Sequence, residues 1–332
     1  MKKYYIANGI IFVIGAAACF VGFLNEGFRS IAFDGPTKVI VQRPESSYQH
    51  FKTYTTAKPF KNAEIDVNET KIYIQKGNKY QVEYRTNQEI KDFKIKNQTL
   101  KITGEDSRFG YFGNDKSELT IVVPNLNALR DLKIKTGSDE NLKLEDLSLE
   151  KLKINNRYQK VTLNNVSVSK ETKLKTENFD IEDCNLNNFD IDSELIYEAV
   201  ITNSTISNFK FKSREGIKIK AMNSKFLGKN KFDMNYDVSV NMQNSEIHNL
   251  ECRSEDIMAS FFKCHFYGDN RFDSDSGKLE FKEINRDLTY QFFADSKNID
   301  LYGKKIKDDF DQENSKNNSL QLKGDSVKAV FK

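Results

Sequence analysis

Apolar residues recur in this chain with a period of about twenty, and this repeat constrains the fold more than any other feature. Each repeat contains two apolar residues separated by one position, and the second residues of successive pairs lie 18 to 22 positions apart. The pairs are Leu142/Leu144, Val161/Leu163, Phe179/Ile181, Ala199/Ile201, Ile217/Ile219, Val238/Val240, Ile257/Ala259 and Leu279/Phe281. Alternation with period two is typical of strands, and a period near twenty is typical of a solenoid whose turns stack on one another.

A second set of residues follows these pairs and predicts where each rung of the solenoid bends. Six of its seven members are Asp or Asn, and each precedes a large apolar residue by three positions. The members are Asp146, Asn165, Asp183, Asn203, Asn223, Asn244 and Lys263. Asn and Asp tolerate the left-handed backbone conformation, so stacked copies would turn the chain at the same place in every rung. The apolar residue of each copy, such as Ile206, should then point into the core.

Between residues 181 and 211 apolar residues recur at every fifth position. Four sides of five residues would form one rung, which locally resembles the quadrilateral β-helix of pentapeptide-repeat proteins. We therefore predict an all-β fold, namely a right-handed β-solenoid (β-helix) with rungs of about 20 residues, partly squared in cross-section.

The N-terminal segment predicts the cellular compartment. Residues 4–24 carry no charge and are long enough, as a helix, to cross a bilayer. Lys2 and Lys3 precede this span, so the positive-inside rule places the N-terminus inside. We predict a single-pass protein of the bacterial cytoplasmic membrane that contacts the lipid bilayer through residues 4–24, with the bulk of the chain extracytoplasmic. A cleaved signal peptide and a lipoprotein modified at Cys19 are the alternatives.

The rest of the chain divides by pattern. We predict a cytoplasmic tail at 1–3, a transmembrane anchor at 4–24, a juxtamembrane stalk at 25–60, an N-terminal β cap at 61–118, the β-solenoid at 119–303, and a C-terminal insertion and cap at 304–332. The caps are expected because a solenoid leaves an open strand edge at each end.

Composition excludes several classes of function. Lys and Arg number 51 and Asp and Glu 48, without long blocks of one sign, so no nucleic-acid footprint is indicated. Four Cys and three His show no zinc spacing, and we predict no metal, no cofactor and no catalytic residue. Cys184, Cys252 and Cys264 are expected to be buried free thiols.

One segment is not explained by the period. Residues 108–113 combine three aromatic residues with two glycines. Phe109, Tyr111 and Phe112 could contact a glycan or a protein partner, or they could fold over the first rung as part of the cap.

The whole pattern resembles the bacterial "putative adhesin" family of membrane-anchored β-solenoid proteins. The resemblance is carried by the anchor at 4–24, by the segments 60–84, 94–105 and 119–134, and by the repeats that follow. It implies a non-enzymatic protein that presents an interaction surface at the bacterial cell envelope, in adhesion or in envelope stress, with an envelope protein or glycan as partner. An accessory subunit bound through anchor and stalk is one alternative, and a carbohydrate-active β-helix enzyme is the other.

Overall fold

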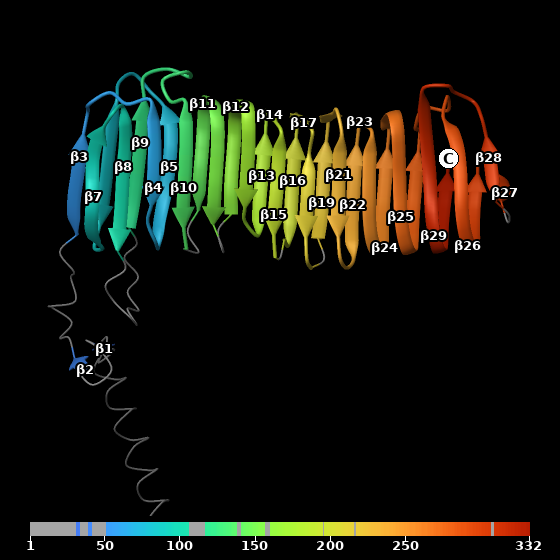
Figure 1. Ribbon diagram of the computed structural model, residues 1–332, viewed down its shortest axis with the longest axis horizontal. Helices are drawn as coiled ribbons and strands as arrows, with labels where there is room; N and C mark the ends of the chain where they lie inside the picture. Colours follow the sequence, from blue (N-terminus) through green and yellow to red (C-terminus); the bar gives the residue numbers. More distant parts are fainter. Residues whose placement is uncertain are drawn as a thin grey trace, which may run out of the picture.

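The structure, a computed structural model, describes residues 31–33, 39–41, 51–105, 117–137, 141–156, 160–194, 196–215, 217–306 and 309–332. Every regular element in these residues is a β-strand. Strands β1 (Ile31–Phe33) and β2 (Val39–Val41) pair only with each other, and the other 27 strands form one hydrogen-bonded sheet. This sheet coils into an elongated solenoid (Figure 1).

A rung in the middle of the solenoid consists of three strands. The first such rung is β13 (Asn178–Glu182), β14 (Asn185–Asn187) and β15 (Phe189–Ser193). Each strand pairs in parallel with the strand at the same position in the next rung, so the molecule has three faces. We call the faces that contain β13, β14 and β15 the first face, the narrow face and the third face.

The other rungs repeat this arrangement. Two of them are β16 (Glu198–Thr202), β17 (Thr205–Ser207) and β18 (Lys210–Ser213), and β19 (Ile217–Met222), β20 (Lys225–Leu227) and β21 (Asn230–Met234). Next come β22 (Val238–Gln243) and β23 (Glu246–His248). Four longer strands continue around corners: β11 (Leu142–Asn156), β12 (Lys160–Lys175), β24 (Leu250–Phe262) and β25 (His265–Lys282).

The solenoid period is more regular than the apolar pairs indicated. Ile201 lies opposite Ala221, not opposite Ile219, and Ala259 lies opposite Leu279. The step of 18 from Ile201 to Ile219 and the step of 22 from Ala259 to Phe281 are therefore steps of 20 in the structure, whereas the step of 18 from Leu163 to Ile181 is a true register step. A slip of two residues leaves every side chain on the same face, which is why the sequence pattern did not reveal it.

The predicted corner residues adopt the predicted conformation. All seven members of the set have a positive φ, between 48° and 54°. A second corner, which the sequence analysis missed, joins the narrow face to the third face. Its positive-φ residues are Asn188, Asn208, Gly228, Asn249 and Gly268.

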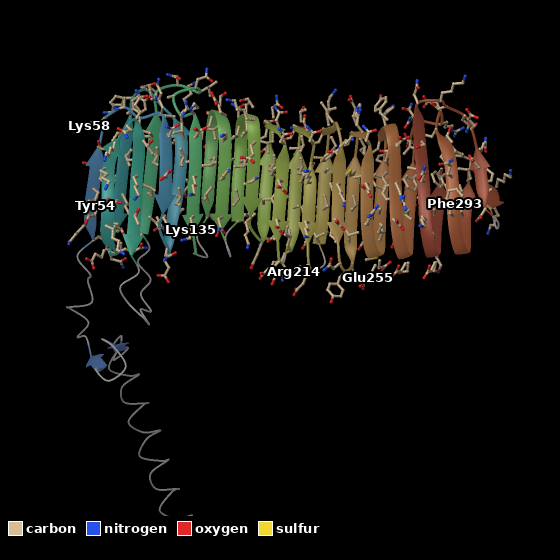
Figure 2. The ribbon with its side chains drawn as sticks, in the orientation of Figure 1. Tyr54, Lys58, Lys135, Arg214, Glu255 and Phe293 are labelled. Carbon is tan, nitrogen blue, oxygen red and sulfur yellow. The ribbon has the colours of Figure 1, made fainter. Side chains whose placement is uncertain are left out.

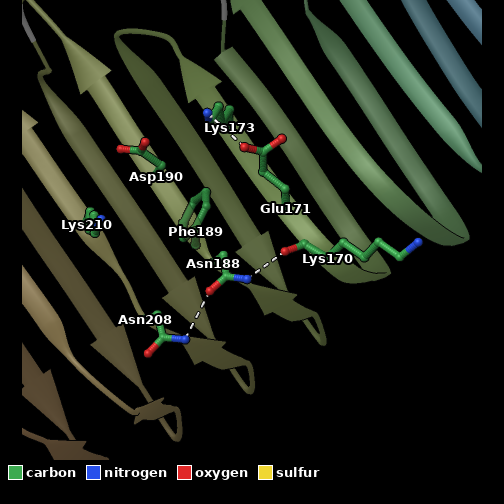
Figure 3. A pocket seen from close by; sticks show the side chains of 8 residues that line it. All are labelled: Lys170, Glu171, Lys173, Asn188, Phe189, Asp190, Asn208 and Lys210. Carbon is green, nitrogen blue, oxygen red and sulfur yellow. Dashed lines mark hydrogen bonds and ion pairs between the residues drawn. The ribbon is translucent and has the colours of Figure 1, made fainter.

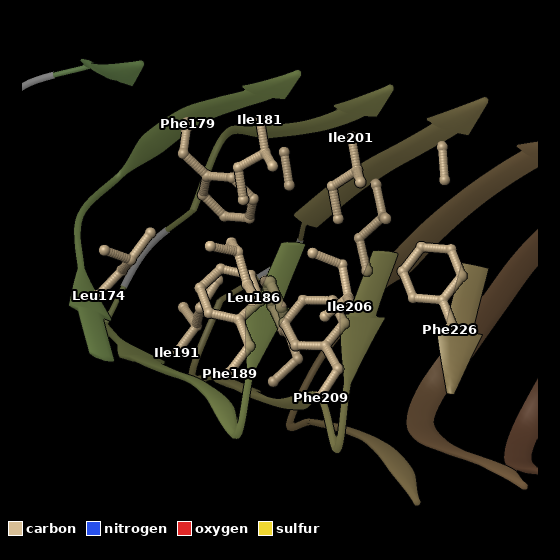
Figure 4. Packing of buried hydrophobic residues seen from close by; sticks show 14 of the residues in the cluster. Leu174, Phe179, Ile181, Leu186, Phe189, Ile191, Ile201, Ile206, Phe209 and Phe226 are labelled. Atoms are coloured by element: carbon tan, nitrogen blue, oxygen red, sulfur yellow. The ribbon is translucent and has the colours of Figure 1, made fainter. Parts of the chain in front are cut away.

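The interior is a continuous apolar core (Figure 4). Leu186, Ile206 and Phe226 stack in register on the narrow face, each at most 1% exposed. Phe189 and Phe209 lie beside this ladder with stacked rings 4.8 Å apart. The residues of the five-residue spacing, from Ile181 to Phe211, are all buried.

The two ends do not follow chain order. At the C-terminal end, β29 (Asn318–Phe331) lies between β25 and β26 (Thr289–Leu301). The short strands β27 (Lys304–Ile306) and β28 (Phe310–Gln312) then pair antiparallel with β26. The range that we predicted as insertion and cap therefore supplies both an inner rung strand and outer edge strands.

The N-terminal end has a related arrangement. Strands β4 (Asn62–Asp66) and β5 (Thr70–Lys76) lie between an outer rung, β8 (Thr99–Glu105) and β9 (Ser117–Val123), and an inner one, β10 (Asp131–Thr136) and β11. Antiparallel strands β3 (Lys52–Thr56), β6 (Gln81–Thr86) and β7 (Glu89–Lys96) cover this end. Strand β3 lies in the range that we predicted as a stalk.

The fold prediction is confirmed in its coarse form, an all-β solenoid, and handedness stays a prediction. The local resemblance to pentapeptide repeats is not supported. Each middle rung has three strands, and Ile196, on the fourth side of the predicted square, lies outside the strands although its side chain is buried.

The localisation prediction is corrected. Across the residues that the structure describes, no helix is long and apolar enough to cross a membrane. The predicted anchor, residues 4–24, lies outside the described residues, as does Cys19.

Candidate interaction surface

Outward lysines form a short basic block on the third face. Lys133 on β10, Lys153 on β11 and Lys173 on β12 are register partners in successive rungs, with all three side chains exposed. Lys135 and Lys175 lie two positions further along β10 and β12. These five lysines line one groove of about 340 Å³, which we call the lysine groove. Its other lining residues are Ile134, Ile154, Asn155, Leu174, Asp190 and Asp192.

The floor of the lysine groove follows from strand geometry. Ile134, Ile154 and Leu174 lie between the two outward positions of their strands, and their side chains are buried in the core. Because side chains alternate across a strand, the backbone of these residues forms the floor and the lysines form the walls. Figure 2 shows Lys135 at the lower edge of this part of the solenoid.

Carboxylates neutralise part of this basic block. Glu171 lies between two lysines, with its Oε2 3.1 Å from Lys153 Nζ and its Oε1 2.8 Å from Lys173 Nζ. These hydrogen bonds, that from Lys173 first, lower the pKa of Glu171. Lys135 Nζ lies 3.1 Å from Asp66 Oδ2 on the neighbouring rung. Within the described part of the chain, Lys133 and Lys175 form no ion pair.

A second groove of about 350 Å³ adjoins the first, at the second corner (Figure 3). It is lined by Lys170, Glu171, Lys173, Asn188, Phe189, Asp190, Asn208 and Lys210. Asn208 Nδ2 donates to Asn188 Oδ1 at 3.1 Å, and Asn188 Nδ2 donates to the carbonyl oxygen of Lys170 at 2.7 Å. These asparagines are already used in holding the corner, so this groove offers fewer free groups than the lysine groove.

The cysteines belong to the scaffold. Cys184 and Cys264 occupy one corner position with Ser204, Ser224 and Ser245. At this position the side chain of each rung accepts a hydrogen bond from the backbone N–H of the preceding rung; Ser204 N, for example, donates to Ser224 Oγ at 3.2 Å.

Burial raises the pKa of Cys184 to about 11 and that of Cys252 to about 12. Cys184, Cys252 and Cys264 are all free and buried, so they do not form a reactive site.

The predicted contact residues Phe109, Tyr111 and Phe112 lie outside the described residues, and their role stays a prediction. Among the residues that the structure describes, no group of three His, Cys, Asp or Glu could hold a metal ion. His248 stacks on its register partner Tyr267, with ring centroids 4.7 Å apart.

The lysine groove was missed by the sequence analysis, although a signal was present. Lys133, Lys153 and Lys173 are spaced by twenty, which is the period of the solenoid itself. The sequence analysis aligned the apolar pairs and the corner residues with that period, but not the charged residues of the outer surface.

The fold is a parallel β-solenoid with two adjoining grooves on its outer surface. A family model described as Toastrack DUF4097 matches residues 60–330, and the chain belongs to this family. This match agrees with the predicted resemblance to a bacterial β-solenoid family in its coarse form. No curated protein matches the chain.

Several solved structures are similar to it, three of which are as follows. A "putative adhesin" from Bacteroides fragilis is 14% identical, with a TM-score of 0.31 over 85% of this chain and 97% of that one. A "putative cell adhesion protein" from Clostridium sporogenes is 11% identical, with a TM-score of 0.19 over 85% and 99%. A "putative adhesin" from Parabacteroides merdae is 10% identical, with a TM-score of 0.25 over 85% and 96%.

Proposed function

We propose that this protein is a non-enzymatic, adhesin-like solenoid that binds a glycan or protein of the bacterial cell envelope through the outer surface of its rungs. The proposal rests on the third face, where two adjoining open grooves lie on the outer surface of the sheet. The inner surface of the same sheet packs against the apolar core. The backbone of such a surface needs no reorganisation to bind, because the rung spacing fixes the positions of its strands.

The acidic groups with a shifted pKa do not show the shift that a glycosidase of the usual kind needs. Among the described residues, five carboxyl groups have a clearly shifted pKa, and all five are lowered by a hydrogen bond from a lysine: Asp92, Glu150, Glu171, Glu198 and Glu280. A glycosidase of the usual kind needs one carboxylic acid whose pKa is raised, beside a second carboxylate. The lowered values are those of ordinary ion pairs on a solvated surface.

An adhesion assay tests this function. Beads coated with the full chain are mixed with bacterial envelope fractions, and the retained material is measured as soluble full chain is added. We expect saturable retention that the soluble protein competes away, and loss of retention when the coating protein is unfolded beforehand. Retention that is equal on beads coated with the unfolded chain would contradict the proposal, as would an absence of retention.

A further inference from the structure

The lysine groove is bounded along the solenoid axis by rungs of the opposite charge. On the preceding rung, Glu64 and Asp66 are the register partners of Lys133 and Lys135. On the following rung, Asp190 is the register partner of Lys173, and Asp192 lies two positions beyond it. The basic block therefore extends over three rungs and stops sharply at both ends.

The spacing inside the block is set by the backbone. Stacked strands lie ~4.8 Å apart, so Lys133, Lys153 and Lys173 project from the backbone at that repeat along one wall. On the other wall, Lys135 and Lys175 lie on either side of Asn155. An extended anionic chain lying in the groove would meet one lysine per rung, provided that its own charges repeat at a similar distance.

We propose that the lysine groove binds about three consecutive uronic acid residues of an acidic polysaccharide, an inference that rests on the proposed adhesive function. One pyranose residue advances a polysaccharide chain by about the height of a rung. Successive carboxylates point to different sides of an extended chain, so they can meet lysines of the two walls in turn. Lys133 and Lys175, at opposite corners of the groove, supply the charges that are not already paired. Lys153 and Lys173 share Glu171, which a ligand carboxylate can replace as their partner.

The chemistry of the walls favours this ligand over other polyanions. Lysine binds as a point charge, and the lining contains no arginine, whose planar fork is preferred for bidentate contacts with phosphate. None of the lining residues is aromatic, whereas proteins that bind single-stranded nucleic acid use aromatic side chains as stacking platforms. The acidic rungs at both ends limit the site to a short stretch of the polymer.

Binding of the full chain to a defined oligosaccharide tests the inference. The probe is a galacturonic acid hexamer, measured by calorimetry beside its methyl ester, a sulfated glycan, polyphosphate and single-stranded DNA. We expect the hexamer to bind most tightly, the methyl ester not to bind, and the affinity for the hexamer to fall with added salt. Tighter binding of a phosphate polymer, of DNA or of the methyl ester would overturn the inference.

A matched pair of variants locates the site. Lys133→Glu with Lys175→Glu reverses the two unpaired charges of the groove. Lys278→Glu with Lys328→Glu makes the same charge change at two exposed register partners on the first face. We expect the groove variant to lose affinity by about tenfold or more and the control to stay within about twofold. Equal affinities for the two variants would overturn the site.

Two further measurements keep these outcomes separable. The milder pair Lys133→Gln with Lys175→Gln is included in case charge reversal disturbs folding, and it should also weaken binding. If the hexamer does not bind while the coated beads still retain envelope material, the polysaccharide inference is wrong and the adhesive function stands. If both assays fail, the adhesive function itself is contradicted.

Discussion

The middle of the solenoid and its two ends are built by different rules. From β13 to β23 the rungs stack in the order in which the chain makes them, and every strand has parallel neighbours on both sides. At each end, the first or last rung is inserted between two rungs that follow one another in the sequence. Antiparallel strands then cover the outermost rung.

This difference shows how a repeat protein ends its sheet. A rung in the middle is specified by its own residues, because the corner residues and the apolar residues of the ladder recur about every twenty positions. An end rung has one neighbour only, and its open edge would pair with other chains. Inserting the first or the last rung inward gives its strands a partner on both sides, while the edge is left to short or antiparallel strands.

The largest effect is expected in the middle, from Ile206→Asp. Ile206 is fully buried between Leu186 and Phe226, so the new carboxylate would have no partner in the core. Loss of several kcal/mol is expected, or a carboxyl group that stays protonated. Urea unfolding curves of the full chain give the change in the free energy of unfolding.

Thr205→Asp is the matched control for this substitution. Thr205 precedes Ile206, points outward and has Lys225 as its register partner. The control should change stability within about 0.5 kcal/mol. Similar losses for the two variants would show that the assigned register of the narrow face is wrong.

The next effect tests the inserted strand at the C-terminal end. The ring of Phe331 on β29 stacks on that of Phe281, with centroids 4.6 Å apart, and also contacts Tyr290 and Phe292 on β26. Phe331→Ala should therefore cost about 3–5 kcal/mol, as for a core aromatic residue, although it is the second-last residue of the chain.

Hydrogen exchange separates this result from simple fraying of a terminus. We expect amides of β26 and β29 to exchange faster together in Phe331→Ala, while those of β16 and β19 keep their protection. If β29 alone became exposed and β26 stayed protected, the insertion of β29 between β25 and β26 would be contradicted.

A smaller effect is expected from the serine position of the first corner. Ser224 accepts a hydrogen bond from Ser204 N at 3.2 Å and donates to the carbonyl oxygen of Met222 at 2.9 Å. Ser224→Ala would leave the buried N–H of Ser204 unpaired, at a cost of about 1–3 kcal/mol. Ser224→Cys should cost less, because Cys184 and Cys264 already occupy this position in other rungs.

Thermal and urea unfolding of both variants give this comparison. Equal losses for the alanine and the cysteine substitutions would show that the hydrogen bond along the corner contributes nothing to stability.

The smallest effect concerns the pH dependence that the buried thiols contribute. Burial raises the pKa of Cys184 from 9.0 to about 11. Between these two pH values the thiol of Cys184 stays protonated in the folded protein and is deprotonated in the unfolded chain. This stabilisation is complete below about pH 9 and is lost as the pH rises through about 11. Unfolding in urea should therefore become easier over this range, by more in the protein with its thiols than in a variant without them.

The variant Cys184→Ser, Cys252→Ala, Cys264→Ser is the reference protein. Its pH dependence of stability measures the contribution of lysine and tyrosine residues, which titrate in the same pH range. In a Cys19→Ser background, the three thiols should also react with a maleimide only after unfolding. A reaction in the folded state, or an equal pH dependence of both proteins, would contradict their burial.

Sequence reasoning succeeded where one residue type has one conformational role. Asp146, Asn165 and Asn203 were placed at left-handed corners because few other residues adopt that backbone readily. It failed at the second corner, where Gly228 and Gly268 interrupt the asparagines and no apolar residue follows at a constant distance. At Gly228 an added Cβ would lie 2.3 Å from Asn208 Oδ1. Glycine is therefore required there by a close contact with the neighbouring rung, which cannot be inferred from the sequence.

The sequence by itself determined the strands, the period and which side chains are buried, because alternation along a strand and corner conformations are local properties of a few neighbouring residues. Only the tertiary structure decided which strands are neighbours at the two ends, because pairing there depends on partners more than twenty residues away and on no repeated signal. The lysine groove belongs to the second kind. Its lysines are unremarkable one by one, and they become a surface only when stacking places Lys133, Lys153 and Lys173 side by side.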